Sequence, residues 1–137
     1  MTTTWQLTID CVDPDPLVRF WALALGYEPA PPPAGHATWR DYYLSIGVPA
    51  SELECDDCVD RLVDPTGRGP AIWFQVVPER KSLKNRLHLD INADDRAAQV
   101  ERLLAAGAHP GDEHIMGDFT WTVLADPQGN QFCVFTH

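Results

Sequence analysis

The sequence predicts one α+β domain built from two similar halves, and three observations support that prediction. A strand-then-helix pattern opens the chain and recurs after residue 85. An Asp-Pro-x-Gly turn stands late in each half, with a run rich in β-branched and aromatic residues after it. The 137 residues, 45% of them hydrophobic, suffice for one ordinary core and are too few for two conventional domains.

The first half opens on a strand that leads into an amphipathic helix. Period-two alternation separates an apolar face, Trp5, Leu7 and Ile9, from a polar face, Gln6, Thr8 and Asp10. Asp13 is suited to cap the helix that follows, and Gly26 stands where this helix would end. The apolar residues at helical spacing are Leu17, Phe20, Trp21 and Ala24.

The second half repeats this pattern from residue 87. In its strand, Leu87, Leu89 and Ile91 alternate with His88, Asp90 and Asn92. Asp94 or Asp95 is suited to cap the next helix, and Gly107 stands where that helix would end. The predicted apolar helical face consists of Ala97, Val100, Leu103 and Leu104.

Matching turns complete the two halves and define a single domain over residues 1–137. "LVDPTG" precedes the β-rich run "AIWFQVV", and "LADPQG" precedes "QFCVF". Proline fixes φ and glycine permits positive φ, so both elements favour tight turns between antiparallel strands. We therefore expect module one over about residues 4–79, a linker over about 80–85, and module two over about 86–137.

Composition narrows the expected partners and the compartment. The formal net charge of −10 opposes the counterion release that drives nucleic-acid binding. No apolar run reaches the roughly 18 residues needed to span a bilayer, and the first residues lack a basic segment followed by an apolar one. The sequence predicts a cytoplasmic protein that binds neither nucleic acid nor membrane.

The four cysteines are expected to be reduced thiols rather than a disulfide framework. Cys55 and Cys58 form a "CDDC" segment that invites a zinc or redox interpretation. A second ligand pair at matching spacing is missing, and the acidic neighbours disfavour thiolate. We therefore interpret this segment as a solvated acidic loop.

Several of these segments together resemble the vicinal oxygen chelate superfamily, within it the glyoxalase-like, bleomycin-resistance and dioxygenase group. The resemblance rests on "IDCVDPDPLVRFWALALGYEP", "NRLHLDINADD", "LLAAGA" and "LADPQGNQFCVF". It implies two tandem βαβββ modules that form a curled mixed sheet around a pocket. It also implies a homodimer, and it implies that the two polar strand faces line the pocket.

Metal-using members of that superfamily take ligands from the first and last strands of each module. Carried over by position, these ligands fall on Gln6, Gln75, His88 and Cys133. Divalent metals are held largely by anionic oxygen or several imidazoles, and both positions where the family has a carboxylate hold another residue. We therefore predict no tightly held divalent metal or other cofactor, and neither glyoxalase I nor ring-cleaving dioxygenase activity.

Two function classes remain for a pocket that takes a small polar metabolite. The first is a metal-independent lyase or isomerase in which His88 acts as acid and base with Asp90 or Asp10. The second is a non-catalytic protein that sequesters its ligand between aromatic walls, for which Trp39, Trp73 and Trp121 are available. In either class the expected ligand-binding residues are Gln6, Thr8, Trp73, Gln75, Asn92 and Cys133. A collapsed pocket with a purely structural role is the third interpretation.

Overall fold

The first half of the chain forms a βαβββ module with a helical insertion. A computed structural model describes residues 2–53 and 59–136. Module one contains β1 (Leu7–Cys11), α1 (Pro14–Leu25), β2 (Glu28–Pro29), β3 (Arg61–Val63) and β4 (Ile72–Val76). Between β2 and β3 lie α2 (Trp39–Ser45) and the short 3₁₀ helix η1 (Ala50–Glu52). Cys55 and Cys58, and the prediction made for them, lie outside the described residues.

The second half repeats the same order of elements without the insertion. Module two contains β5 (Asp90–Asn92), α3 (Arg96–Ala105), β6 (His109–Met116), β7 (Phe119–Ala125) and β8 (Gln131–Phe135). The two four-stranded sheets have the equivalent orders β1-β4-β3-β2 and β5-β8-β7-β6. In each sheet the first strand pairs parallel with the last strand and the other pairings are antiparallel. The predicted α+β fold of paired βαβββ modules is confirmed.

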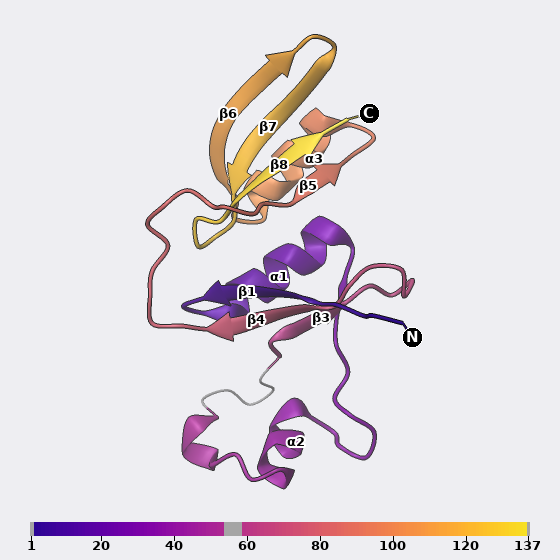
Figure 1. The fold of residues 1–137 in the computed structure, drawn as a ribbon, viewed down its shortest axis with the longest axis vertical. Coiled ribbons are helices and arrows are strands. Elements are labelled where there is room, and N and C mark those ends of the chain that lie inside the picture. Colours follow the sequence, from indigo (N-terminus) through magenta and orange to yellow (C-terminus); the bar gives the residue numbers. More distant parts are fainter. Residues whose placement is uncertain (1, 54–58, 137) are drawn as a thin grey trace.

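The two modules share one hydrophobic core. In Figure 1, α1 lies between the sheet of its own module and module two. The Trp21 ring on α1 lies 5.0 Å from the Phe132 ring on β8, centroid to centroid, and the Phe20 ring lies 5.8 Å from it. These rings belong to a continuous cluster of buried residues from both halves. The helix of module one therefore packs on module two as well as on its own sheet.

The helix signals are confirmed at most positions. The Asp13 side chain accepts a hydrogen bond from the Asp15 backbone N–H at 3.1 Å, and Gly26 ends α1 with φ of 67°. Asp95, rather than Asp94, caps α3 by accepting from the Ala98 N–H at 3.0 Å. The predicted face of α1 is buried at all four positions.

The predicted apolar face of α3 is only partly correct. Leu103 is fully buried and Val100 packs against the core, but Ala97 and Leu104 are exposed. The helix contacts β7 and β8, and it does so along a stripe centred on Leu103. This stripe is narrower than the arc that helical spacing predicts.

Both first strands begin later than alternation predicts. Trp5 and Gln6 precede β1, and Leu87 and His88 precede β5. Trp5 and Leu87 are exposed by 71% and 85%, so neither belongs to the buried face assigned to it. The pairing explains this difference, because β1 begins to pair only at Leu7, opposite Ile72, and β5 only at Asp90, opposite Cys133.

A buried aspartate in the turn before β8 joins the modules. Asp126 is fully buried, and its Oδ1 accepts from the backbone N–H groups of Gln128 and Asn130 at 2.9 and 3.1 Å. Its Oδ2 accepts from Nε1 of Trp21 at 3.1 Å. The Gln128 side chain reaches the same neighbourhood, where its Oε1 accepts from the Val12 N–H at 2.8 Å. The turn of module two thus holds the β1–α1 corner of module one.

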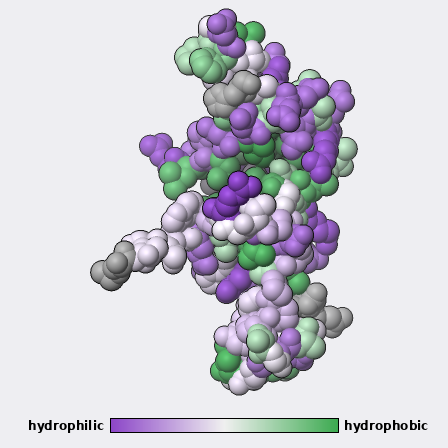
Figure 2. Space-filling view, turned by 90° about the vertical axis from the view of Figure 1, so that its right-hand side faces the viewer, coloured by the Kyte–Doolittle hydropathy of each residue, from purple (hydrophilic) through white to green (hydrophobic). Residues whose placement is uncertain are grey.

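The surface has one end rich in apolar side chains. The hairpin of β6 and β7 forms the top of the molecule in Figures 1 and 2, where hydrophobic surface is visible. Ile115, Met116 and Phe119 there are exposed by 71%, 64% and 54%. Among the described residues, no helix has both the length and the apolar character needed to cross a membrane.

We predict that Trp21→Phe destabilises the protein by about 1–3 kcal/mol, because Oδ2 of the buried Asp126 loses its indole donor. Urea unfolding measures this change in the free energy of unfolding. Trp5→Phe, at an exposed site, is the matched control and should change stability little. Equal effects of the two substitutions would show that the Asp126 junction contributes nothing.

Candidate functional site

Three chemically different side chains meet on the polar face of module two. His88 lies just before β5, Asp90 begins β5, and Cys133 on β8 is the direct parallel partner of Asp90. The His88 Nε2 atom lies 3.4 Å from Asp90 Oδ1. One donor atom of each of the three residues lies within 4.8 Å of the others. We call His88, Asp90 and Cys133 the polar cluster.

The Cys133 thiol is held in its protonated form by its surroundings. Partial burial raises its pKa most, and the neighbouring Asp90 carboxylate raises it further through its charge and a side-chain hydrogen bond. The positive charge of Lys84 has a smaller, opposite effect on this pKa. The thiol is therefore protonated at neutral pH and a poor nucleophile.

The polar cluster lines part of a cavity of about 550 Å³. We call it the module-two cavity. Its walls are mainly apolar, namely Met116, Phe119, Trp121, Val123, Phe132 and Phe135. Only Trp121 of these was expected from the sequence. Alternation along β7 was the available signal, because Phe119, Trp121 and Val123 occupy every second position and therefore share a face.

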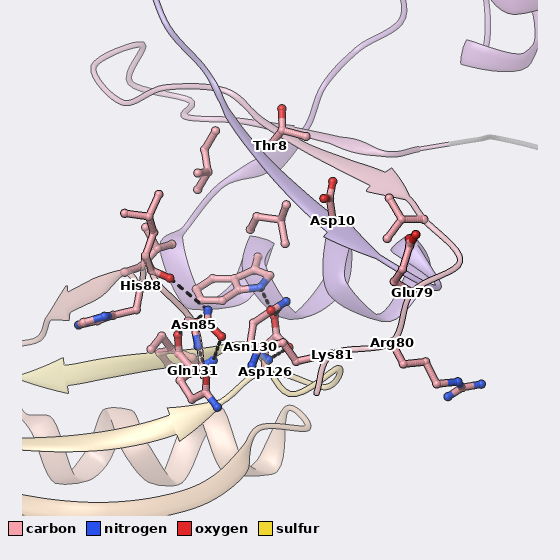
Figure 3. A pocket seen from close by; sticks show the side chains of 17 residues that line it. Thr8, Asp10, Glu79, Arg80, Lys81, Asn85, His88, Asp126, Asn130 and Gln131 are labelled. Atoms are coloured by element: carbon pink, nitrogen blue, oxygen red, sulfur yellow. Dashed lines mark hydrogen bonds between the residues drawn. The ribbon is translucent and has the colours of Figure 1, made fainter. Parts of the chain in front are cut away.

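A second cavity, of about 660 Å³, lies between the modules. We call it the inter-module cavity. Figure 3 shows Thr8 and Asp10 on β1 at one side of it, and Asn85 and His88 on the chain before β5 at the other side. His88 lines both cavities, whereas Asp90 and Cys133 line only the module-two cavity. In Figure 3 the His88 imidazole and the Asp10 carboxylate do not point toward one another. His88 thus pairs with Asp90 at close range, and a catalytic role of Asp10 stays a prediction.

Four of the expected ligand-binding residues lie elsewhere in the part of the chain that the structure describes. Gln6, Trp73, Gln75 and Asn92 line neither cavity. Trp73 donates its indole N–H to Asp60 Oδ2 at 3.1 Å, and its ring lies 5.4 Å from the Arg61 guanidinium carbon. Trp39 is buried and stacks on the same guanidinium at 5.1 Å. Both indole rings thus hold Arg61 within module one.

Asp60, next to Arg61 in the chain, completes this arrangement in module one. Burial raises the pKa of its carboxyl group, and hydrogen bonds from Trp73 and Tyr43 together with the Arg61 charge act in the opposite direction. The Tyr43 hydroxyl reaches Asp60 from α2 at 3.5 Å. The insertion between β2 and β3 therefore supplies side chains that contact Asp60 and Arg61 at the start of β3.

The metal site implied by the resemblance is not assembled from its expected positions. His88 and Cys133 line the module-two cavity, but Gln6 and Gln75 do not. Asp90, which that set does not include, supplies the carboxylate beside His88 and Cys133. The residues present therefore do not fit the two-module site.

Both the sequence and the fold are similar to those of known proteins. The sequence matches the glyoxalase-like domain family over residues 6–135. The chain belongs to this family. A search of curated proteins finds no match to this sequence.

Solved structures share the architecture at low sequence identity. A glyoxalase/bleomycin resistance protein/dioxygenase family enzyme from Burkholderia phytofirmans has 18% identity and a TM-score of 0.60, with 96% of this chain and 95% of that chain covered. A superfamily member from Sphaerobacter thermophilus has 15% identity and a TM-score of 0.59, with 100% and 98% covered. The fosfomycin resistance protein FosX from Mesorhizobium loti has 12% identity and a TM-score of 0.60, with 100% and 93% covered. These similarities establish the fold of the glyoxalase-like domain, and the resemblance seen in the sequence is confirmed. The homodimer and the cytoplasmic location stay predictions.

We predict that Asp90→Asn accelerates alkylation of Cys133 by iodoacetamide in metal-free protein at mildly alkaline pH. Removing the carboxylate charge should lower the Cys133 pKa and increase the thiolate fraction. Peptide mass spectrometry resolves the modified sites. Cys11, whose pKa burial raises to about 11, is the internal control and should remain unmodified. An unchanged Cys133 rate would place its thiol outside the influence of Asp90.

Proposed function

We propose that this glyoxalase-like domain binds a small, ring-bearing and largely apolar molecule in the module-two cavity. The observation that carries the proposal is the division of this cavity into two parts. Aromatic side chains, including Phe119, Trp121 and Phe135, form its walls, and His88 and Asp90 form its polar end.

The size and lining of the cavity support a ligand of this class. Small-molecule sites commonly occupy about 300–1,000 Å³ and combine apolar walls with a few polar groups that set orientation. The cavity volume of about 550 Å³ falls within that range. Offset and edge-on contacts with aromatic rings favour a planar ligand, and a carboxylate favours an amine or hydroxyl donor at its polar end.

The non-catalytic function therefore has the stronger support of the two expected from the sequence. Sequestering a ligand requires matched walls and a polar anchor, and both are present in the module-two cavity. The ligand class also differs from the small polar metabolite expected at first, because most of the lining is apolar.

General acid–base catalysis is the second candidate, and the contact between His88 and Asp90 favours it. With its carboxylate 3.4 Å from Nε2, Asp90 would hold a proton on that nitrogen and leave Nδ1 as the base. Such a base removes a proton from a carbon acid bound against the aromatic walls, and the imidazolium formed returns that proton at another position. This chemistry requires no group beyond His88 and Asp90.

For the binding proposal, we predict that Phe119→Ala weakens binding of small aromatic probes about 10-fold, because one ring contact of about 1.4 kcal/mol is lost. Isothermal titration calorimetry with phenethylamine, naphthol and phenylacetone measures the dissociation constants. Ile115→Ala, in the same hairpin but outside the cavity lining, is the matched control. Equal weakening by both substitutions, or no binding of any probe to the wild type, would contradict the proposal.

For the catalytic candidate, we predict that the wild-type protein accelerates deuterium exchange at the acidic C–H groups of phenylacetone in D₂O. His88→Gln should reduce the rate to that of the uncatalysed solution, as followed by proton NMR. His109→Gln, which changes an exposed histidine outside both cavities, should retain the acceleration. Exchange that is no faster with wild type than in buffer argues against the acid–base role and leaves the binding proposal intact.

A further inference from the structure

The polar cluster brings together three types of metal-binding atom from β5, β8 and the segment just before β5. It offers an imidazole nitrogen from His88, a carboxylate oxygen from Asp90 and a sulfur from Cys133, all within 4.8 Å of one another. The parallel register places Asp90 directly beside Cys133. Because His88 and Asp90 are two residues apart, both side chains can approach the same point from one face.

The nature of these atoms selects among metals. A thiolate is a soft ligand that favours zinc over magnesium, calcium or manganese, and zinc commonly binds Cys, His and Asp together. Thiolate and carboxylate together neutralise the charge of Zn²⁺. Three protein ligands would leave one tetrahedral position open, and the same three residues line the module-two cavity.

We propose that His88, Asp90 and Cys133 form a zinc site that belongs to module two alone. It retains His88 and Cys133 from the positions implied by the family resemblance, but Asp90 replaces Gln6 and Gln75 as the further ligand. It therefore replaces the sequence-based expectation of no tightly held metal. Its carboxylate comes from the first strand of the module, and a thiolate occupies the last. The proposal goes beyond the binding function, since the apolar walls of the cavity are present with or without a metal.

The surroundings of the polar cluster include features that favour zinc binding and one that opposes it. The half-exposed side chains of His88 and Asp90 stay close to water, so little desolvation opposes entry of the ion. Lys84 is the positive charge that also lines this cavity and acts against a cation. Formation of a zinc–sulfur bond would release the proton of the Cys133 thiol to solvent.

Cobalt(II) provides a direct test, because a thiolate ligand gives a near-ultraviolet charge-transfer band that nitrogen and oxygen ligands do not. The titration uses metal-free full-length protein carrying Cys55→Ser and Cys58→Ser, which removes the thiols of the "CDDC" segment. We expect the band to saturate at one equivalent of Co²⁺ per chain and to disappear when Zn²⁺ is added. Cys133→Ser in this background should abolish the band, and His109→Ala should leave it unchanged.

His88→Ala is a second test at an exposed position and should weaken Co²⁺ binding at least about 10-fold. Circular dichroism verifies the fold of each variant. A missing band in the parent protein, or a band that survives Cys133→Ser, would overturn the proposal. The calorimetric titrations with aromatic probes are performed with chelator present, so a failure of the zinc site is distinguishable from a failure of the ligand cavity.

Discussion

The rest of the structure depends on the hydrogen bonds that the buried carboxylate of Asp126 accepts. A carboxylate removed from water is costly unless donors surround it, and here two backbone N–H groups and the Trp21 indole do so. The same contacts fix the turn that leads into β8 and position α1 against module two. Since Cys133 lies on β8 and β5 pairs with that strand, the geometry of the polar cluster follows from this junction.

The equivalent turn of module one also contains an aspartate that accepts hydrogen bonds, but this aspartate does not join the two modules. Asp64 accepts hydrogen bonds from Thr66 and Gly69 within its own turn, and these bonds lower the pKa of its carboxyl group. It contacts no helix of the other module through any hydrogen bond among the residues described. The same Asp-Pro-x-Gly turn therefore connects the two modules in the second half of the chain and forms only a local turn in the first half.

The two halves have also diverged in what their sheets offer to a ligand. In module one, the insertion between β2 and β3 places Trp39 against Arg61 and Tyr43 against Asp60, and the Arg61 guanidinium contacts two indole rings. In module two, the corresponding space remains open and is lined by aromatic side chains. The ligand site that we propose therefore lies in module two alone.

Local sequence patterns predicted those features that short-range physics determines. Alternation placed His88 and Asp90 on one face, helical spacing identified the buried side of α1, and the capping role of Asp13 followed from its residue type. The contact between Asp90 and Cys133 was not accessible in this way, because it depends on the register of two strands far apart in the chain. Nor could the roles of Trp39 and Trp73 be predicted, since both depend on where the insertion places its side chains.

The position of His88 in the wall of both cavities gives the two spaces a common boundary. If the imidazole turned toward a ligand in one space, it would withdraw from the other and change the shape of that neighbouring cavity. Two binding equilibria that share such an element are thermodynamically linked, and the factor by which the first affects the second equals the factor in the reverse direction. Rotation of the His88 side chain alone would then link ligand binding in the two cavities.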